Sequence, residues 1–389
     1  MSEPPPPGST PYSRKNPFPA KLTVNHSLSR PPCEKDVRHF VINLEGSGLS
    51  YRPGDSLGIY PRNSAQLVDE TIAQLGLDPE TQVTDPKGQQ TSFRTALIHQ
   101  YALNRAAKKF MKALIERIPQ GEQRNRLMAL AKSDEDLNAY VSTRDYVDIL
   151  RDFDEAKFLT PEGFLSAISP ISPRLYSISS SFQMHPGEVH LTVAVVRYET
   201  HGRRKVGLAS GFLADQVQLN VSEIPLFVQE SHSFRLPDSA CDIIMCGPGT
   251  GIAPFRAFLE QRILDGATGR NWIFFGEQNR ATSFLYEAEF TDYQNQGKLH
   301  RLDTAFSRDQ AEKIYVQDRI REQGAELWKW LQNGAYFYVC GDAKRMAKDV
   351  NEALISVAQA HGGMSPEAAV NYVNVTLMKT EKRYLRDVY

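Results

Sequence analysis

The chain has 389 residues, of which 41% are hydrophobic and 23% charged, and its formal net charge is -1. This length suits about two or three packed domains of ordinary globular composition, and the charge balance predicts no nucleic-acid partner. The four cysteines form no CxxC pair. Zinc, iron–sulfur and disulfide-framework spacings are therefore missing from the sequence, and we expect no metal.

The first 17 residues, "MSEPPPPGSTPYSRKNP", are rich in proline and polar residues and predict a disordered or polyproline lead-in. They do not have the charged and then apolar pattern of a secretory signal. No apolar run approaches the roughly 18 residues that a membrane-spanning helix needs. We therefore expect a cytoplasmic protein that has no membrane partner.

Two strand-like regions flank a helical one. Residues 18–66 contain "KLTVNHSL", "RHFVINLEG" and "DSLGIYP", which are short strand patterns separated by Gly and Pro. Residues 67–165 have apolar positions at helical spacing, as in "NRAAKKFMKALIERI" and "STRDYVDILRDF". Residues 166–235 return to strands in "RLYSISSS", "EVHLTVAVVRY" and "SEIPLFVQ". The economical interpretation is one β unit that is interrupted by a helical insert.

Residues 236–389 have a different pattern of apolar and helical segments. The apolar runs "CDIIMC", "NWIFFGE" and "AYFYVCGD" alternate with the helical stretches "PFRAFLEQRILDG", "YVQDRIREQGAELWKWLQ" and "AKRMAKDVNEALISVAQAHG". Buried strands that alternate with helices predict a doubly wound α/β domain with a parallel sheet covered on both faces. Ligands of such domains bind at the carboxyl ends of the strands.

A glycine-rich turn follows the first of these strands. In "CGPGTGIAPF" the strand runs into Gly249, Thr250 and Gly251, and a helix is predicted to open near Ala253. Glycines there let backbone N–H groups approach a phosphate, and a helix N-terminus favours negative charge. The turn is neither GxGxxG nor a Walker loop. The alternative is an ordinary strand-to-helix turn.

The stretch "SRDQAEKIYVQ" places cations near the same edge. Ser307 and Arg308 end a predicted strand, and Lys313 and Gln317 lie four apart on one face of a predicted helix. Arg308 and Lys313 could pair with a doubly charged phosphate, such as the 2′-phosphate of NADPH. The alternative is a solvated helix face.

Two further stretches carry candidate chemistry. In "RLYSISSS", strand alternation puts Arg174 and Tyr176 on one face, which suits a charged aromatic cofactor such as a flavin dinucleotide. An ordinary barrel strand with an exposed arginine is the alternative. In "VCGDAKRMAKDV", Cys340 ends a buried strand at the ligand edge, although a lone cysteine is more often part of a core. Asp342 and Asp349 could cap a helix, bind a ribose or simply be solvated.

In this order and with the ending "KRYLRDVY", these stretches resemble the NADPH/FAD half of the diflavin reductases, and within that family the sulfite reductase flavoprotein subunits. "RPGDSLGIYP", "HLTVAVVRY" and "FFGEQ" extend the resemblance from about residue 18 to the end. The resemblance implies a ferredoxin-NADP-reductase-like fold. An FAD-binding antiparallel β-barrel (18–66 and 166–235) would carry the helical connecting insert (67–165), and a doubly wound NADP-binding α/β domain (236–389) would follow.

The resemblance also implies roles for individual residues. FAD would be bound by Arg174, Leu175, Tyr176, Ser177, Thr192, Val193, Ala194, Tyr198, Gly207, Leu208, Ala209, Ser210 and Tyr389. NADPH would be bound by Gly249, Thr250, Gly251, Ser307, Arg308, Lys313, Ile314, Tyr315, Val316, Gln317 and Asp349. Ser177, Cys340 and Asp387 match the hydride-transfer cluster of the family. Tyr389 would shield the flavin face opposite Tyr176 and swing aside for the nicotinamide.

The implied activity is NADPH-dependent reduction of FAD, followed by electron transfer to a sulfite reductase haemoprotein that reduces sulfite to sulfide. In the full-length family a flavodoxin-like FMN domain precedes this module, whereas here only about twenty Pro-rich residues do. We therefore expect the electrons to pass directly or through a separate flavodoxin-like FMN protein. Ala194 departs from the family pattern, which suggests glycine there.

Two other functions stay open at this point. A general ferredoxin– or flavodoxin–NADP reductase shares the barrel and the nucleotide domain but normally lacks the long helical insert. A non-catalytic assembly subunit would keep the fold without turnover. The insert favours the sulfite reductase type, and the complete set of Ser177, Cys340, Asp387 and Tyr389 argues against the non-catalytic subunit.

Overall fold

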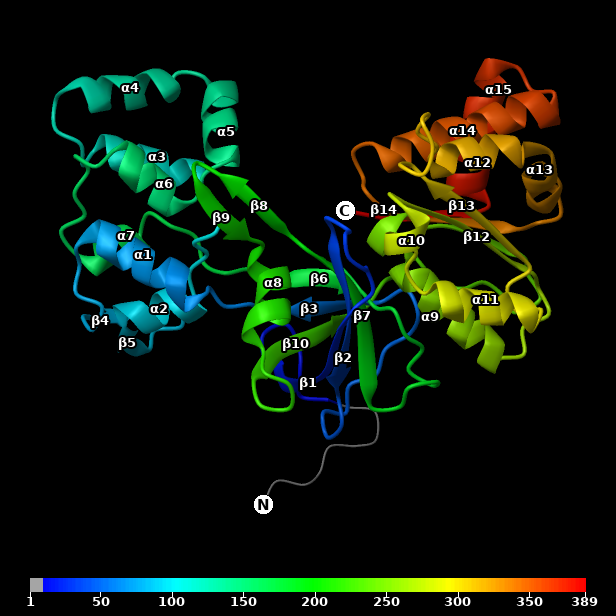
Figure 1. Cartoon of the computed structure of the whole chain (residues 1–389), viewed down its shortest axis with the longest axis horizontal. Coiled ribbons are helices and arrows are strands. Elements are labelled where there is room, and N and C mark those ends of the chain that lie inside the picture. The colour runs from blue at the N-terminus through cyan, green and yellow to red at the C-terminus, as the bar shows by residue number, and fades with distance from the viewer. Residues whose placement is uncertain (1–9) are drawn as a thin grey trace. The chain divides into compact units, whose positions relative to one another are not determined.

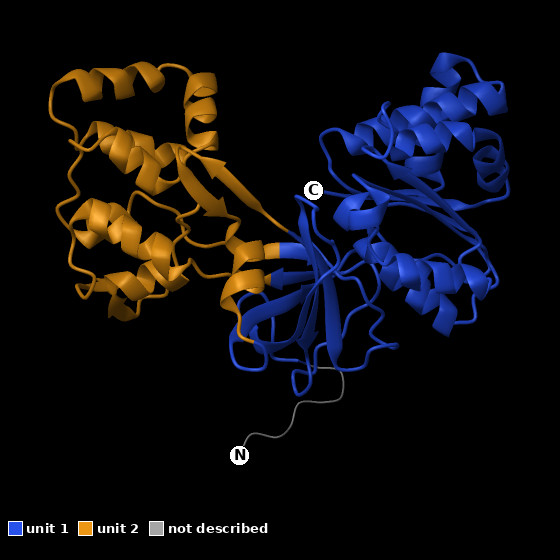
Figure 2. Cartoon of the chain, viewed as in Figure 1, with its two compact units in different colours: residues 1–58, 175–194, 219–389 blue, residues 59–174, 195–218 orange. Residues whose placement is uncertain are grey.

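The computed structural model describes residues 10–389 (Figure 1). Contacts within the chain divide it into two compact units (Figure 2). Unit 1 consists of the chain up to Gly58 together with Leu175–Ala194 and Leu219–Tyr389, and unit 2 consists of Ile59–Arg174 and Val195–Gln218. The domain boundaries predicted from the sequence stay predictions.

Six strands form an antiparallel sheet in the order β6-β3-β10-β1-β2-β7. They are β1 (Phe18–Ser27), β2 (Asp36–Asn43), β3 (Ser56–Ile59), β6 (Arg174–Ser177), β7 (Glu188–Val195) and β10 (Glu223–Gln229). An antiparallel bridge between Ile178 and Leu191 joins the end of β6 to β7. Ser179 N–H donates to the His190 carbonyl at 2.9 Å beside it. The two outer strands therefore meet, and the predicted antiparallel β-barrel is confirmed.

Five strands form the second sheet of unit 1, in the order β13-β12-β11-β14-β15. They are β11 (Ile243–Cys246), β12 (Asn271–Glu277), β13 (Arg301–Phe306), β14 (Tyr336–Gly341) and β15 (Tyr384–Val388). Each neighbouring pair is parallel. All five carboxyl ends consequently lie at one edge of the sheet, as predicted for a doubly wound domain.

Helices cover both faces of this parallel sheet (Figure 1). They are α9 (Ala253–Leu264), α10 (Arg280–Ser283), α11 (Glu287–Asn295), α12 (Val316–Glu322), α13 (Gly324–Gln332), α14 (Met346–Gly362) and α15 (Pro366–Asn371), with a π-helical segment at Tyr372–Thr380. Alternate residues of β11 enter two separate cores: Ile244 and Cys246 pack with α12, α13 and α14, while Ile243 and Met245 pack with α9 and α11. Burial on both faces explains why the strands have near-continuous apolar sequences.

The stretch predicted as one helix, "YVQDRIREQGAELWKWLQ", is two helices. Gln323 ends α12 and also precedes the first residue of α13. Trp330 and Leu331 of α13 join the same core as Ile320 of α12. The break therefore turns the second helix without removing its apolar face from the sheet.

Unit 2 contains the helical insert and two short antiparallel strand pairs. Its helices are α1 (Ala65–Leu75), α2 (Phe93–His99), α3 (Lys108–Ile115), α4 (Glu122–Leu130), α5 (Asp134–Ser142), α6 (Tyr146–Asp152), α7 (Pro161–Leu165) and α8 (Leu208–Gly211), the last continued by a π-helical segment at Phe212–Gln216. Its strand pairs are β4 (Gln82–Thr84) with β5 (Gln90–Ser92), and β8 (Arg197–Thr200) with β9 (Arg203–Val206). Among residues 10–389, no helix has both the length and the apolar character needed to cross a bilayer.

The predicted N-terminal lead-in falls mostly outside the description, since residues 1–9 are not among those that the structure describes. Residues 10–17 make defined contacts. The Thr10 hydroxyl donates to the Ser47 carbonyl at 2.8 Å, and the Tyr12 ring meets that of Phe18 with centroids 4.9 Å apart. These contacts attach the chain to the barrel from Thr10 onward.

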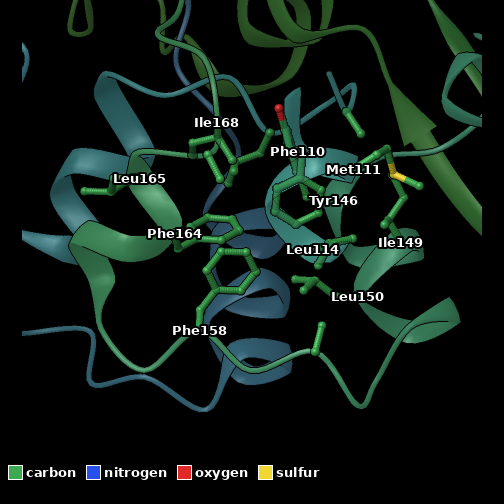
Figure 3. Close-up of a cluster of buried hydrophobic side chains, with 14 of the residues drawn as sticks. Phe110, Met111, Leu114, Tyr146, Ile149, Leu150, Phe158, Phe164, Leu165 and Ile168 are labelled. Atoms are coloured by element: carbon green, nitrogen blue, oxygen red, sulfur yellow. The ribbon is translucent and has the colours of Figure 1, made fainter. Parts of the chain in front are cut away.

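Phe110 of α3 lies at the centre of the hydrophobic core of unit 2 (Figure 3). It is fully buried, and its ring centroid lies 4.8 Å from that of Tyr146, 5.6 Å from Phe158 and 5.9 Å from Phe164. Removing a ring from such a core leaves a cavity that the neighbours fill only partly. We expect Phe110→Ala to lower the free energy of unfolding by about 3–5 kcal/mol, measured by urea denaturation.

Leu159 offers a matched control for this substitution, because its side chain lies in the same unit and is 87% exposed. Leu159→Ala should change the free energy of unfolding by less than about 0.5 kcal/mol. Equal effects of the two substitutions would contradict the assignment of Phe110 to the centre of the core.

Candidate functional site

The glycine-rich turn lies at the carboxyl edge of the parallel sheet. β11 ends at Cys246, a 3₁₀ turn spans Gly249–Ile252, and α9 begins at Ala253, as predicted. Gly249 has φ +57°, in the left-handed region that favours glycine. A Cβ on Gly251 would lie 2.1 Å from the carbonyl oxygen of Cys340. Only glycine fits there, so the turn packs directly on the end of β14.

A cleft of about 690 Å³ adjoins this turn in unit 1. It brings together most of the residues predicted to bind NADPH: Gly249, Ser307, Arg308, Lys313, Tyr315, Val316, Gln317 and Asp349. Thr250, Gly251 and Ile314 are not among the residues that line it. A dinucleotide with an extra phosphate fits a cleft with this cationic lining, and the assignment of each residue to the nucleotide stays a prediction.

Ser307 and Arg308 are fixed by the neighbouring strand end. Ser307 N–H donates to the Glu277 carbonyl at 2.9 Å, and Arg308 N–H donates to the Gln278 carbonyl at 2.8 Å. The half-exposed Arg308 guanidinium lies 3.2 Å from a carboxylate oxygen of Glu34. The backbone of Ser307 and Arg308 is therefore held in place, while the Arg308 guanidinium is half-exposed to solvent.

The prediction that Lys313 and Gln317 share a helix face is wrong. α12 begins only at Val316, and Lys313 precedes it in an irregular segment. The Asp318 carboxylate accepts a hydrogen bond from Tyr315 N–H at 2.9 Å, which fixes the first turn of the helix at that point. Lys313 and Gln317 nevertheless line the same cleft.

Ser177, Cys340 and Asp387 meet in unit 1, although the sequence separates them widely. The Ser177 hydroxyl donates to Asp387 Oδ2 at 2.9 Å, and the Cys340 thiol donates to the same oxygen at 3.9 Å. Cys340 and Asp387 are register partners on β14 and β15. One carboxylate oxygen therefore accepts from both a hydroxyl and a thiol at the strand ends.

Burial controls the protonation of this cluster. It raises the pKa of Asp387 above its ordinary value, and the hydrogen bonds from Ser177 and Cys340 oppose that shift. Burial also raises the pKa of the Cys340 thiol well above its usual range, and the Asp387 charge adds to the shift. The thiol therefore keeps its proton at neutral pH and acts as a hydrogen-bond donor instead of a nucleophile.

Tyr389 ends the chain beside the glycine-rich turn. Its backbone N–H donates to the Gly341 carbonyl at 3.1 Å, and its α-carboxyl oxygen accepts from Ala343 N–H at 3.1 Å. The phenol oxygen lies 3.1 Å from the Thr250 hydroxyl, while the side chain is 56% exposed. The backbone of the last strand is thus anchored and the ring covers the turn from outside.

Several of the predicted FAD-binding residues lie in unit 1. The Thr192 and Val193 side chains are buried, and the Thr192 hydroxyl lies 2.6 Å from the phenol oxygen of Tyr286. Any contact of these two residues with a cofactor would therefore use backbone atoms. Leu175 and Ala194 are exposed, and Tyr176 is partly buried. Ala194, the departure from the family pattern, directs only a methyl group outward.

The remaining predicted FAD-binding residues, Arg174, Tyr198 and Gly207–Ser210, lie in unit 2. Arg174 and Tyr198 are exposed, Gly207 is the N-cap of α8, and Leu208–Ser210 are the first residues of that helix. Gly207 N–H donates to the Val196 carbonyl at 2.8 Å, and a Cβ on Gly207 would lie 2.7 Å from Ser210 Oγ. Close backbone packing of this kind suits a pyrophosphate-binding turn.

Buried ion pairs hold the strand that leads into this turn. Arg203 of β9 contacts Asp145 at 2.6 Å, Asp148 at 2.9 Å and Glu70 at 2.5 Å. Lys205, also buried, pairs with Asp148. Glu70 belongs to α1, while Asp145 and Asp148 form the capping box of α6. The helices of unit 2 therefore fix the position of the strand before Gly207.

Comparison with known families bears on both cofactors. Residues 10–212 match the FAD binding domain family, and residues 245–352 match the oxidoreductase NAD-binding domain family. The first match covers more than half of the chain. The chain belongs to the FAD-binding domain family. The pair of domains confirms the predicted cofactors, FAD and NADPH, and the predicted two-domain fold.

This FAD-binding family member is also similar to curated relatives. It is 46% identical to a protein of Mannheimia succiniciproducens over 379 residues, 46% to one of Cronobacter sakazakii over 385, and 44% to one of Escherichia coli O9:H4 over 382. Each is named sulfite reductase [NADPH] flavoprotein alpha-component. The alignments cover 97–98% of this chain but 62% of each relative's length.

Sequence reasoning missed part of the cleft of this family member. Lys35, Pro248, Gly276, Glu277, Gln278, Ala305, Arg345 and Met346 also line it, beside Asp342, for which the sequence left a ribose contact open. Pro248 and Arg345 adjoin predicted motifs, so proximity in sequence could have found them. No local pattern connects Lys35 with Glu277, because 242 residues separate them.

One group of side chains bears on the expectation of no metal. Among residues 10–389, potential ligand atoms of His185, Glu188 and His190 lie within 4.8 Å of one another. An Arg256 guanidinium nitrogen lies 3.5 Å from Nδ1 of His190. This cation disfavours a second one beside it, and the expectation of no metal stays a prediction.

Proposed function

We propose that this chain is the NADPH-oxidising, FAD-containing part of an electron-transfer flavoprotein. Its acceptor would be a sulfite reductase haemoprotein, reached directly or through a flavodoxin-like FMN protein. The names of the curated relatives support this acceptor. A cytoplasmic location belongs to the proposal and is supported by four free cysteines without a disulfide.

The contact between the glycine-rich turn and the hydride-transfer cluster carries this proposal. Gly251 of the turn packs against the carbonyl of Cys340, and Cys340 donates to Asp387. A nucleotide whose pyrophosphate binds the turn would therefore extend toward the cluster at the same strand ends. Positioning of this kind is what hydride transfer requires from a protein.

FAD, when bound, supplies a two-electron acceptor that can release electrons one at a time. The residues of this chain supply orientation and polarity. Asp387 accepts hydrogen bonds from the Ser177 hydroxyl and the Cys340 thiol and orients both donors. The Tyr389 ring excludes water from the strand ends until the nicotinamide enters.

The test is NADPH oxidation by the FAD-loaded protein with a sulfite reductase haemoprotein and sulfite, with and without added flavodoxin. Sulfide formed without flavodoxin supports direct transfer, and sulfide formed only with flavodoxin supports a carrier in trans. Reduction of flavodoxin without sulfide would favour a general NADP reductase. No NADPH oxidation with any acceptor, ferricyanide included, would favour a non-catalytic subunit.

A further inference from the structure

A lysine from the barrel reaches into the nucleotide cleft of unit 1. Lys35 precedes β2, and its ammonium donates to both carboxylate oxygens of Glu277, at 2.8 and 3.1 Å. Glu277 is the last residue of β12, and its side chain is 2% exposed. Its Oε2 also accepts Gln278 N–H at 2.7 Å. The carboxylate is therefore fixed in place and holds the ammonium.

Glu277 lies against the glycine-rich turn. A Cβ built on Gly249 would lie 3.5 Å from Glu277 Oε1. A buried carboxylate at this distance from a pyrophosphate site repels the anion strongly, since little water separates the two charges. The Lys35 ammonium cancels this charge. An ammonium has three N–H donors, and the Lys35 side chain stays 45% exposed, so it can also donate to a ligand in the cleft.

Lys35 decides the sign of the net charge of the side chains that line the cleft. The cations are Lys35, Arg308, Lys313 and Arg345, and the carboxylates are Glu277, Asp342 and Asp349. Without Lys35 the charges would balance, although the expected ligand is a polyanion. With Lys35 the cleft has a net positive charge, which attracts the nucleotide.

We propose that Lys35 is a ligand of the nucleotide pyrophosphate and that Glu277 holds it in position. The inference rests on the proposed function, since it assumes that the cleft binds NADPH. Arg308 and Lys313 would contact the 2′-phosphate, while Lys35 would contact the phosphates next to Gly249. The two groups of cations then bind different parts of the same ligand.

Two ligands distinguish contacts with the pyrophosphate from contacts with the 2′-phosphate. NADP⁺ contains both the pyrophosphate and the 2′-phosphate, whereas 2′-AMP contains only the latter. We expect Lys35→Met to weaken NADP⁺ binding about tenfold in isothermal titration calorimetry, the usual loss for one charge-assisted contact, with 2′-AMP binding unchanged. Lys329→Met is the control, because Lys329 is an exposed lysine paired with Glu326 at 3.6 Å and does not line the cleft.

Glu277→Gln tests the same assignment in the opposite direction. It removes the negative charge beside the turn, while the amide oxygen can still accept a hydrogen bond from the Lys35 ammonium, so NADP⁺ should bind several-fold more tightly. Unchanged NADP⁺ binding in Lys35→Met, or weaker binding of 2′-AMP, would overturn the proposal. Equal or weaker NADP⁺ binding in Glu277→Gln would overturn it as well. Wild-type protein that binds no NADP⁺ would instead contradict the proposed function.

Discussion

Alanine at both Arg308 and Lys313 is expected to lower the preference for NADPH over NADH by about two to four decades, because two charge-assisted contacts of about 1.5–3 kcal/mol each are lost. Both side chains line the nucleotide cleft. Glu34, 3.2 Å from Arg308, is exposed in the structure. An exposed pair of this kind contributes only about 0–1 kcal/mol, so a phosphate can displace it.

The measurement is kcat/KM for ferricyanide reduction with each nucleotide. The loss should fall on NADPH alone, since NADH offers a hydroxyl where NADPH has the phosphate. Arg321→Ala with Lys329→Ala is the matched control: it removes the same charges from α12 and α13, outside the cleft. An unchanged preference, or an equal loss with both nucleotides, would contradict the assignment of these two residues to the 2′-phosphate.

Much of the fold could be predicted because a strand that is buried on both faces has a continuously apolar sequence. Strand β11 is apolar at every position, since its alternate residues enter two different cores. The break between α12 and α13 at Gln323 does not interrupt the apolar pattern of the sequence. Ile320 before it and Trp330 after it pack into one core, so the apolar spacing continues through the break. Periodicity alone therefore predicts a single helix there.

The site could be predicted where its geometry is local. The turn around Gly251 needs glycine for a steric reason, and strand, turn and helix follow within a few residues. The start of α12 depends on the Asp318 cap, which a count of helical spacing does not weigh, and Lys313 was misplaced for that reason. The contact of Ser177 with Asp387 spans 210 residues, and only the family resemblance pointed to it.

Protonation of Asp387 does not by itself destabilise the folded protein. Burial raises the folded-state pKa of Asp387, so its neutral form is favoured in the folded protein. This contribution to stability is fully present below the ordinary aspartate pKa and is lost as the pH rises through the raised value. Mild acid therefore protonates Asp387 without unfolding the protein through this group.

Asp387→Asn is expected to slow the reduction of bound FAD by NADPH about a hundredfold, within the range of positioned proton donors and acceptors. The asparagine can still accept from Ser177 but lacks the carboxylate charge at the strand ends, while burial alone keeps the Cys340 thiol protonated. In stopped-flow measurements the wild-type rate should fall as the pH drops through the raised pKa of Asp387, since protonation removes the same charge. The Asp387→Asn rate should stay low and lack this acidic limb.

The role of the Cys340 thiol can be tested by comparing Cys340→Ala with Cys246→Ala, since both substitutions leave a cavity of the same size in the parallel sheet. Cys340 and Cys246 are both buried on the parallel sheet, but only Cys340 contacts Asp387, and Cys246 packs into the opposite core. Cys340→Ala should slow flavin reduction, whereas Cys246→Ala removes the same volume and should leave the rate unchanged. Wild-type speed in Cys340→Ala would contradict a role of the thiol in hydride transfer. Equal slowing in both variants would mean that packing of the sheet, and not the hydrogen bond to Asp387, controls the rate.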